Sequence, residues 1–277
     1  MQRAFIYELL KLINEGNDRA LLISATGTGK TYASAFAMRE LGFKRVLFLV
    51  HRNQIAKQAK TSFEKVFGSK IRAGIVSGNQ HDYDVDFVFA TVQTLSKMEN
   101  LQKFSKDYFE ACIYDEAHHT SAESFKRVMD YFTPQFILGM TATPDKRDDN
   151  VEGRNIYEIF NHNIAYEIRL QQAMEEDLLC PFHYFGITDL QMISDEGKTK
   201  EEQLENFRYL TSDERVRYVM EQAKYFGYSG ERVKGLIFCS RIEEARELSR
   251  KFNEHGWRTM ALSGADSEEA RARAIER

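Results

Sequence analysis

The eight residues 24–31 read Ser-Ala-Thr-Gly-Thr-Gly-Lys-Thr and directly follow a short apolar run. The two glycines, Gly27 and Gly29, allow the backbone to turn so that successive N–H groups point inward at an anion. A helix that starts after this turn directs its positive N-terminus at the same place. Lys30 adds a positive charge for the β- and γ-phosphates of a nucleotide, and Thr31 offers a hydroxyl ligand for Mg²⁺. The pattern predicts a phosphate-binding loop, and the alternative is an ordinary glycine-rich turn before a helix.

A second group of candidate residues, Asp115 and Glu116, lies at the end of an apolar run that has the length of a buried strand, residues 111–115. A carboxylate there can hold Mg²⁺ beside the phosphates, and a second carboxylate can polarise the attacking water. We therefore expect Asp115 to be a metal ligand and Glu116 to be the catalytic base, with Lys30 as a catalytic partner. An Asp-Glu pair alone is weak evidence, but a parallel sheet brings this pair and the phosphate loop to one edge.

The elements that must position these residues alternate between strand and helix over the first ~145 residues. Fully apolar runs such as residues 46–50 are typical of parallel strands that are covered on both faces. Repeated β–α units of this kind predict an α/β fold with a doubly wound parallel sheet. The expected helices are near residues 5–13, 30–41 and 53–67, and the expected strands are near residues 20–23, 46–50, 71–76, 87–90, 111–115 and 136–140.

After a connecting segment at residues 148–179, a second α/β pattern begins. Its expected strands are residues 182–187, 233–239 and 258–262, with helices at 201–228 and 243–254 and a final amphipathic helix. Three strands are few for a free-standing sheet. We therefore expect two domains, residues 1–180 and an incomplete second domain at residues 181–277.

Composition excludes several classes of protein. The net charge of −4 argues against a chain that holds nucleic acid by bulk electrostatics, so any such contact must be a local groove. No apolar run approaches the roughly 20 residues that a membrane span needs. The cysteines are Cys112, Cys180 and Cys239, and their odd number and wide spacing indicate neither disulfides nor a zinc site. We expect a cytoplasmic protein without a membrane partner.

Three motifs occur in a fixed order, each after an expected strand: the loop at residues 25–31, Asp-Glu-Ala-His at 115–118 and Thr-Ala-Thr-Pro at 141–144. Together they resemble a superfamily-two DEAD/DEAH-box helicase of the bacterial type related to restriction-enzyme Res subunits. The resemblance implies a RecA-like P-loop NTPase domain followed by a partial second RecA-like domain. Ser24 departs from the pattern, because the P-loop motif has a glycine there.

The resemblance also implies ATP and Mg²⁺ as cofactors and assigns roles to further residues. Gln2 is similar to the glutamine that reads adenine, although the residues that precede this glutamine in the family have no counterpart here. The implied ATP-binding residues are Gln2, Ala25, Thr26, Gly27, Thr28, Gly29, Lys30 and Thr31, and the implied coupling residues are His118, Thr141 and Thr143. The implied nucleic-acid contacts are His51, Arg52, Thr91, Gln93, Thr94, Ser240 and Arg241. For Thr91 and Thr94 the alternative is a capping role for the following helix.

The function that the resemblance implies is the ATP-binding motor core of a nucleic-acid-dependent ATPase, a helicase or translocase that contacts the nucleic-acid backbone. DNA is favoured over RNA as the partner, and the sequence does not decide between the two. Family members complete the ATP site with a Gln-x-x-Gly-Arg-like motif, and no such motif follows Arg241. We therefore expect a piece of a longer protein that is weakly active alone and works with its remaining domains. The alternatives are a restriction-type translocase that does not unwind duplex DNA, a regulatory module that binds ATP without turnover, and an ATPase without a nucleic-acid partner.

Overall fold

The chain divides into two compact units, Met1–Pro181 and Phe182–Arg277. The computed structural model describes residues 2–119, 122–144, 155–187, 200–228 and 230–276. The first part of the expected connecting segment, residues 148–154, lies outside this range. Each unit has its own hydrophobic core, so each is described by itself.

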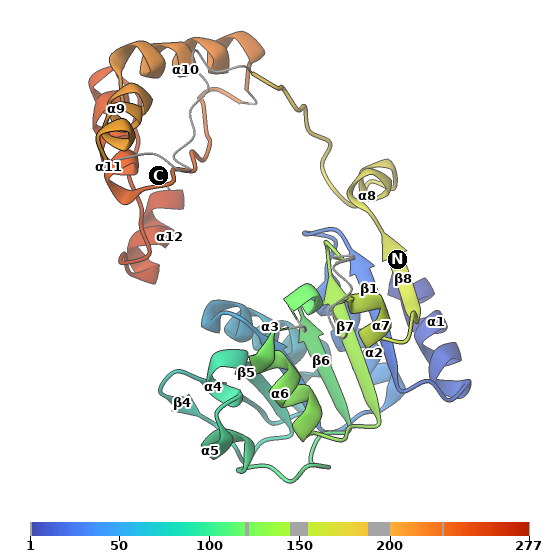
Figure 1. Cartoon of the computed structure of the whole chain (residues 1–277). Helices are drawn as coiled ribbons and strands as arrows, with labels where there is room; N and C mark the ends of the chain where they lie inside the picture. Colours follow the sequence, from blue (N-terminus) through green and yellow to red (C-terminus); the bar gives the residue numbers. More distant parts are fainter. Residues whose placement is uncertain (1, 120–121, 145–154, 188–199, 229, 277) are drawn as a thin grey trace. The chain divides into compact units, whose positions relative to one another are not determined.

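The first unit is built on one sheet of eight strands in the order β4-β3-β5-β2-β6-β7-β1-β8 (Figure 1). Every neighbouring pair is parallel except β3 and β4. The strands are β1 (Arg19–Ser24), β2 (Val46–Val50), β3 (Ala73–Ser77), β4 (Gln80–His81), β5 (Phe87–Thr91), β6 (Ala111–Asp115), β7 (Phe136–Thr141) and β8 (Ile164–Ile168).

Helices cover both faces of this sheet, which confirms the doubly wound α/β fold (Figure 1). One core contains side chains of α1 (Gln2–Asn14), α2 (Lys30–Leu41) and α3 (Asn53–Phe67). The core on the other face contains side chains of α4 (Val92–Leu95), α5 (Met98–Leu101), α6 (Glu123–Tyr131) and α7 (Ile156–Ile159). Two short 3₁₀ turns, η1 (Gly68–Lys70) and η2 (Ala117–His119), and one further helix, α8 (Leu170–Glu175), complete the unit.

The register of the central strands sets where the loops emerge. Gly139 of β7 lies opposite Tyr114 of β6 on one side and opposite Leu21 of β1 on the other. Because β6, β7 and β1 are adjacent and parallel, their carboxyl ends reach the same edge of the sheet. Ligands of open α/β sheets bind at this edge.

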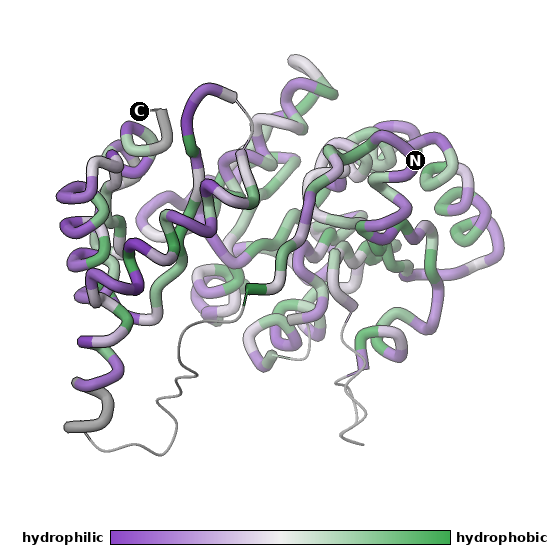
Figure 2. Tube along the Cα trace, turned by 90° about the horizontal axis from the view of Figure 1, so that it is seen from above, coloured by the Kyte–Doolittle hydropathy of each residue, from purple (hydrophilic) through white to green (hydrophobic). Residues whose placement is uncertain are grey.

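The second unit is helical in the part of it that the structure describes. Its helices are α9 (Lys200–Leu210), α10 (Asp213–Phe226), α11 (Ile242–Glu254) and α12 (Glu268–Glu276). Hydrophilic and hydrophobic residues alternate along the helices, as expected for helices with one buried face (Figure 2). A small core joins α10 to α11 through Val216, Met220, Leu248 and Phe252.

The three strands expected in this unit are a wrong prediction. Residues 182–187, 233–239 and 258–262 pair with no strand within the described residues. The middle stretch is apolar but open to solvent, with Leu236 78% and Phe238 91% exposed. A strand needs a neighbour for its backbone hydrogen bonds, and local hydrophobicity does not provide one.

Two strands of the sheet, β4 and β8, were not predicted. The expected connecting segment contains β8, which pairs in parallel with β1 at the edge of the sheet. In none of the described ranges is a helix both long and apolar enough to cross a membrane.

Candidate nucleotide and metal site

The phosphate loop occupies the turn between β1 and α2. Its glycines have left-handed backbones, with φ of +90° at Gly27 and +87° at Gly29, a region that side chains other than glycine rarely enter. Gly29 directly precedes α2, and the N–H of Ala33 donates to its carbonyl at 2.9 Å. The loop therefore lies at the positive N-terminus of a twelve-residue helix, a site that favours anions.

Two hydroxyls inside the loop bond to each other. The Ser24 and Thr28 Oγ atoms are 2.5 Å apart, and Thr28 Oγ1 donates to the Ala25 carbonyl at 2.7 Å. Ser24 is the residue that departs from the glycine pattern, and its side chain is here part of the hydrogen bonding that holds the loop. The sequence showed the departure but not this role.

Lys30 is the cation of the loop. Its Nζ donates to the carbonyls of Ser24 at 2.9 Å and Ala25 at 3.3 Å. Burial lowers the pKa of Lys30, and the charges of Asp115 and Glu116 oppose that shift. The structure thus brings the predicted cation and the two predicted carboxylates together, although 84 residues of chain separate Lys30 from Asp115.

Asp115 ends β6 and is almost fully buried, with 9% of its surface exposed. Burial first, and the neighbouring charge of Glu116 second, raise the pKa of Asp115 to about 6. Lys30 works against this shift, as does the Glu116 N–H, which donates to Asp115 Oδ1 at 3.1 Å. Burial thus disfavours the charged form of Asp115, and a cation that arrives with a ligand would stabilise that form.

The donor set around Asp115 fits Mg²⁺. Magnesium typically binds through one or two carboxylates together with substrate phosphates and water. Among the described residues, no three His, Cys, Asp or Glu side chains form a site that could hold a metal by themselves. Asp115 and Thr31, a residue in the first turn of α2, stay the predicted ligands of a Mg²⁺ that comes with a nucleotide.

Glu116 has an unusual backbone, with φ of +54°. Left-handed conformations cost a non-glycine residue free energy and cluster at functional sites. The side chain of Glu116 is 40% exposed, so it is accessible to water. This combination suits a carboxylate that must face a reacting group.

The predicted coupling residues form one connected cluster. His118 Nδ1 lies 3.4 Å from Glu116 Oε2 and 3.0 Å from Thr141 Oγ1. The Thr143 N–H donates to Thr141 Oγ1 at 3.1 Å, so the Thr141 hydroxyl contacts both Thr143 and His118. Glu116 is thereby joined through one imidazole to the segment that follows β7.

The predicted nucleic-acid residues of the first unit follow the carboxyl ends of β2 and β5. Arg52 and Gln93 are exposed, whereas the ring of His51 packs edge-on against Phe125 at 4.7 Å between centroids. Thr91 is buried, and its Oγ1 lies 3.2 Å from Ser77 Oγ and 3.0 Å from Thr94 Oγ1.

The hydroxyls of Thr91 and Thr94 therefore bond mainly to neighbouring segments of the protein. Thr91 occupies the residue before α4 but makes no side-chain cap there. Thr94 Oγ1 instead accepts the N–H of Gly78 at 3.1 Å. The structure contradicts the capping alternative, while the nucleic-acid contact stays a prediction.

The remaining predicted residues lie elsewhere. Gln2 is exposed at the start of α1. In the second unit, Ser240 Oγ donates to the buried Glu244 at 3.0 Å, and Arg241 directly precedes α11. The structure leaves the roles of these three residues as predictions.

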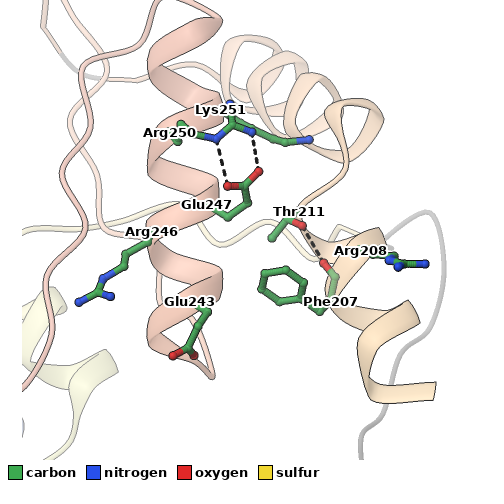
Figure 3. Close-up of a pocket in the computed structure, with 8 residues that line it drawn as sticks. All are labelled: Phe207, Arg208, Thr211, Glu243, Arg246, Glu247, Arg250 and Lys251. Atoms are coloured by element: carbon green, nitrogen blue, oxygen red, sulfur yellow. Dashed lines mark hydrogen bonds and ion pairs between the residues drawn. The ribbon is translucent and has the colours of Figure 1, made fainter. Parts of the chain in front are cut away.

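A depression of about 620 Å³ in the second unit lies between α9 and α11 (Figure 3). Some of its charges are paired: Arg250 Nε donates to Glu247 at 3.0 Å, and Lys251 lies 3.3 Å from Asp213. No predicted site residue lines it, so we assign it no part in nucleotide binding.

Comparison with known proteins assigns the chain to a family. Residues 1–146, more than half of the chain, match the family described as type III restriction enzyme, res subunit. The chain belongs to this family. The predicted Res-type resemblance is thereby confirmed.

Individual relatives agree with this membership. The chain is similar to the endonuclease subunit of the type I restriction enzyme EcoAI of Escherichia coli, with 28% identity over 272 residues that cover 88% of this chain and 33% of the relative. It is 25% identical over 156 residues to the DNA 3'-5' translocase XPB2 of Sulfurisphaera tokodaii, covering 56% of this chain and 33% of the relative. The chain thus spans about a third of the length of these relatives.

A solved structure shows the same fold. A fragment described as an HsdR subunit of a type I restriction enzyme from Vibrio vulnificus superposes with a TM-score of 0.61 and 21% identity. The match covers 92% of this chain and 44% of that chain.

Proposed function

We propose that the chain is the ATP-binding motor core of a nucleic-acid-dependent ATPase that moves along DNA as a helicase or translocase. The observation that carries the proposal is that Lys30 interacts electrostatically with Asp115 and Glu116 at the carboxyl edge of one sheet. A cation for phosphates, a carboxylate for metal and a carboxylate for water are the parts that phosphoryl transfer to water requires.

In this proposal each residue acts on a defined atom. Backbone N–H groups of the loop bind phosphate oxygens, and Lys30 exchanges its bonds to the Ser24 and Ala25 carbonyls for bonds to phosphate. Asp115 and Thr31 hold Mg²⁺, which when bound neutralises charge on the phosphates. Glu116 orients the attacking water and takes up its proton.

The cluster around His118 supports a coupling role. A change in hydrogen bonding at Glu116 reaches Thr141 through a single imidazole, and Thr141 is bonded to the backbone of Thr143. We propose that these bonds transmit the state of the nucleotide to the segment after β7.

A DNA partner is supported by two of the relatives, a restriction enzyme subunit and a protein named as a DNA translocase. The negative net charge favours a local track over a positive surface. We propose that exposed Arg52 and Gln93 lie on this track and contact the nucleic-acid backbone. We further propose that the second unit, with Ser240 and Arg241, is the first part of a second RecA-like domain. Because the chain spans about a third of the length of its relatives, we propose that it hydrolyses ATP slowly on its own.

The proposal is tested first by nucleotide titration. Lys30→Ala should abolish binding of Mg-ATP while the protein stays folded, because Lys30 lies in the loop rather than in a hydrophobic core. Lys65→Ala, on the exposed surface of α3, is the matched control and should bind like the parent. Equal affinity of Lys30→Ala and Lys65→Ala would remove Lys30 from the site.

ATP turnover with different nucleic acids separates the rival functions. Stimulation by DNA over RNA supports the proposed partner, and strand separation distinguishes a helicase from a translocase that leaves the duplex intact. Mg-ATP binding without turnover, in a protein that carries the remaining domains, would indicate a regulatory module instead.

A further inference from the structure

The segment that leads out of the first unit returns to the phosphate loop. It follows β8 as α8 and continues to Leu179 (Figure 1). The Cδ2 atom of Leu179 lies 3.0 Å from the position that a Cβ atom on Gly27 would occupy. The side chain of Leu179 is thus in contact with the apex of the loop, at the glycine whose φ is +90°.

The contact belongs to a small, separate core. Ala25, Ile168 and Ala173 are buried together, and Leu179 packs against them. The N–H of Ala25 donates to the Ile168 carbonyl at 3.1 Å, which ties the loop to β8. The Ala173 carbonyl accepts the N–H of Leu179 at 3.1 Å, so α8 fixes the position of this leucine.

Two adjacent leucines differ in what they touch. Leu178 is 39% exposed and is not part of the small core, although its N–H also donates to the Ala173 carbonyl, at 2.9 Å. Leu179 is half-buried and contacts the loop. Leu178 is therefore a matched control for the effect of the Leu179 side chain on the loop.

We propose that Leu179 is a positioning residue of the nucleotide site, which holds the loop at Gly27 and links its occupancy to the connecting segment. The inference rests on the proposed function, since it requires the loop to bind ATP. A glycine-rich loop loses much conformational freedom when it is ordered, so a contact that orders it beforehand increases affinity for the ligand.

The route from the phosphates to the segment runs through Ala25. Its carbonyl accepts hydrogen bonds from Lys30 Nζ and Thr28 Oγ1, while its N–H is bonded to β8 and its side chain lies in the small core. When a phosphate oxygen replaces the Ala25 carbonyl as the hydrogen-bond partner of Lys30, Ala25 loses that bond. Ala25 packs with Ala173 of α8 and with Leu179, so the change reaches the connecting segment.

Binding linkage makes the effect reciprocal. If the Leu179 contact strengthens nucleotide binding by some factor, nucleotide strengthens the contact by the same factor. In the parent chain, Mg-ATP should therefore slow hydrogen exchange at the amides of Leu178 and Leu179, which both donate to Ala173.

The experiment compares three variants of the full chain by titration with Mg²⁺ and a non-hydrolysable ATP analogue. Leu179→Ala should weaken binding about tenfold, a size usual for coupling between sites. Leu179→Met, which refills the space, should restore affinity to within about twofold of the parent, because this swap nearly conserves volume. Leu178→Ala should bind like the parent.

Parental affinity in Leu179→Ala would overturn the inference, and so would unchanged exchange at Leu178 and Leu179 in the parent with bound nucleotide. If Leu179→Ala does not fold, hydrogen exchange in the parent chain alone decides the test. A parent chain that binds no nucleotide would refute the proposed function and this inference together. A parent that binds while Leu179→Ala binds equally well would refute the inference only.

Discussion

Glu116 combines two properties at the scale of a single residue. Its backbone is in the left-handed region, and its side chain reaches both water and His118. The conformation is unfavourable for glutamate, and the residue lies between the end of β6 and the turn η2.

Glu116→Gln should keep Mg-ATP binding and stop turnover, because an amide cannot take up a proton from water. We expect hydrolysis to fall by at least about a hundredfold, in line with the usual contribution of a general base. Single-turnover hydrolysis, measured in a protein that carries the remaining domains, checks this. Glu123→Gln, an exposed residue of α6, serves as the control. Hydrolysis at the parental rate in Glu116→Gln would assign the base to another group.

Asp115 carries a stability cost that depends on pH in the metal-free protein. Its pKa is about 6 in the folded chain against 3.8 for the ordinary group, so the folded state binds this proton more tightly than the unfolded state. The free energy of unfolding therefore decreases as pH rises from about 4 to about 6, and the full cost is present above pH 6.

Asp115→Asn should remove this cost. At pH 7 the free energy of unfolding of the first unit should increase by about 1–3 kcal/mol, from a shift of about two pKa units at ~1.4 kcal/mol each. Urea denaturation at pH 7 and pH 5 tests the sign, since the gain should be smaller at pH 5. A loss of stability, or an equal gain at both pH values, would show that burial of Asp115 is not the cause.

At the scale of elements, β7 depends on a glycine inside the strand. A Cβ atom at Gly139 would lie 2.5 Å from Phe160 and 2.8 Å from Leu21. Gly139→Ala must displace a buried aromatic ring, so we expect a loss of about 1–3 kcal/mol in the free energy of unfolding, as for other overpacked cores.

Thermal unfolding of Gly139→Ala checks this expectation. The control is Gly186→Ala, because no atom lies within 4 Å of an added Cβ there. If the two variants unfold at the same temperature, the ring of Phe160 has room to move and the strand tolerates a side chain.

Most helices and strands of the first unit were predictable because each has a local hydrophobic pattern in its own sequence. The bounds of α2, β2, α3 and β6 agree with the sequence prediction. The edge strand β8 was missed, since polar residues such as Glu167 alternate with its buried ones and a strand covered on one side resembles an ordinary connection.

The motifs of the sequence predicted the candidate site, and the roles of its residues stay predictions. Lys30, Asp115, Glu116, His118 and Thr141 were found from the sequence, and the structure brings them together. The bond between Ser24 and Thr28 and the contact of Leu179 with Gly27 were not found, because each depends on a distance that no local pattern encodes.

At the scale of the whole molecule, the two units have separate cores. The buried clusters of the first unit contain residues only up to Leu179, and the cluster of the second contains residues of α10 and α11. We expect a chain that ends at Pro181 to keep the unfolding temperature of the first unit within about 2 °C, since less than about 0.5 kcal/mol is then lost. Calorimetry of both chains tests this, and a larger decrease would show that the second unit stabilises the first.

The cysteines offer a practical consequence of the fold. Cys180 is exposed and directly follows Leu179, whereas Cys112 is fully buried in β6. Burial raises the pKa values of the Cys112 and Cys239 thiols, which suppresses the thiolate that reacts with a maleimide. A fluorescent dye added to the unaltered chain should therefore attach first at Cys180. The sequence thus provides a preferred attachment point next to Leu179, the residue that contacts the phosphate loop.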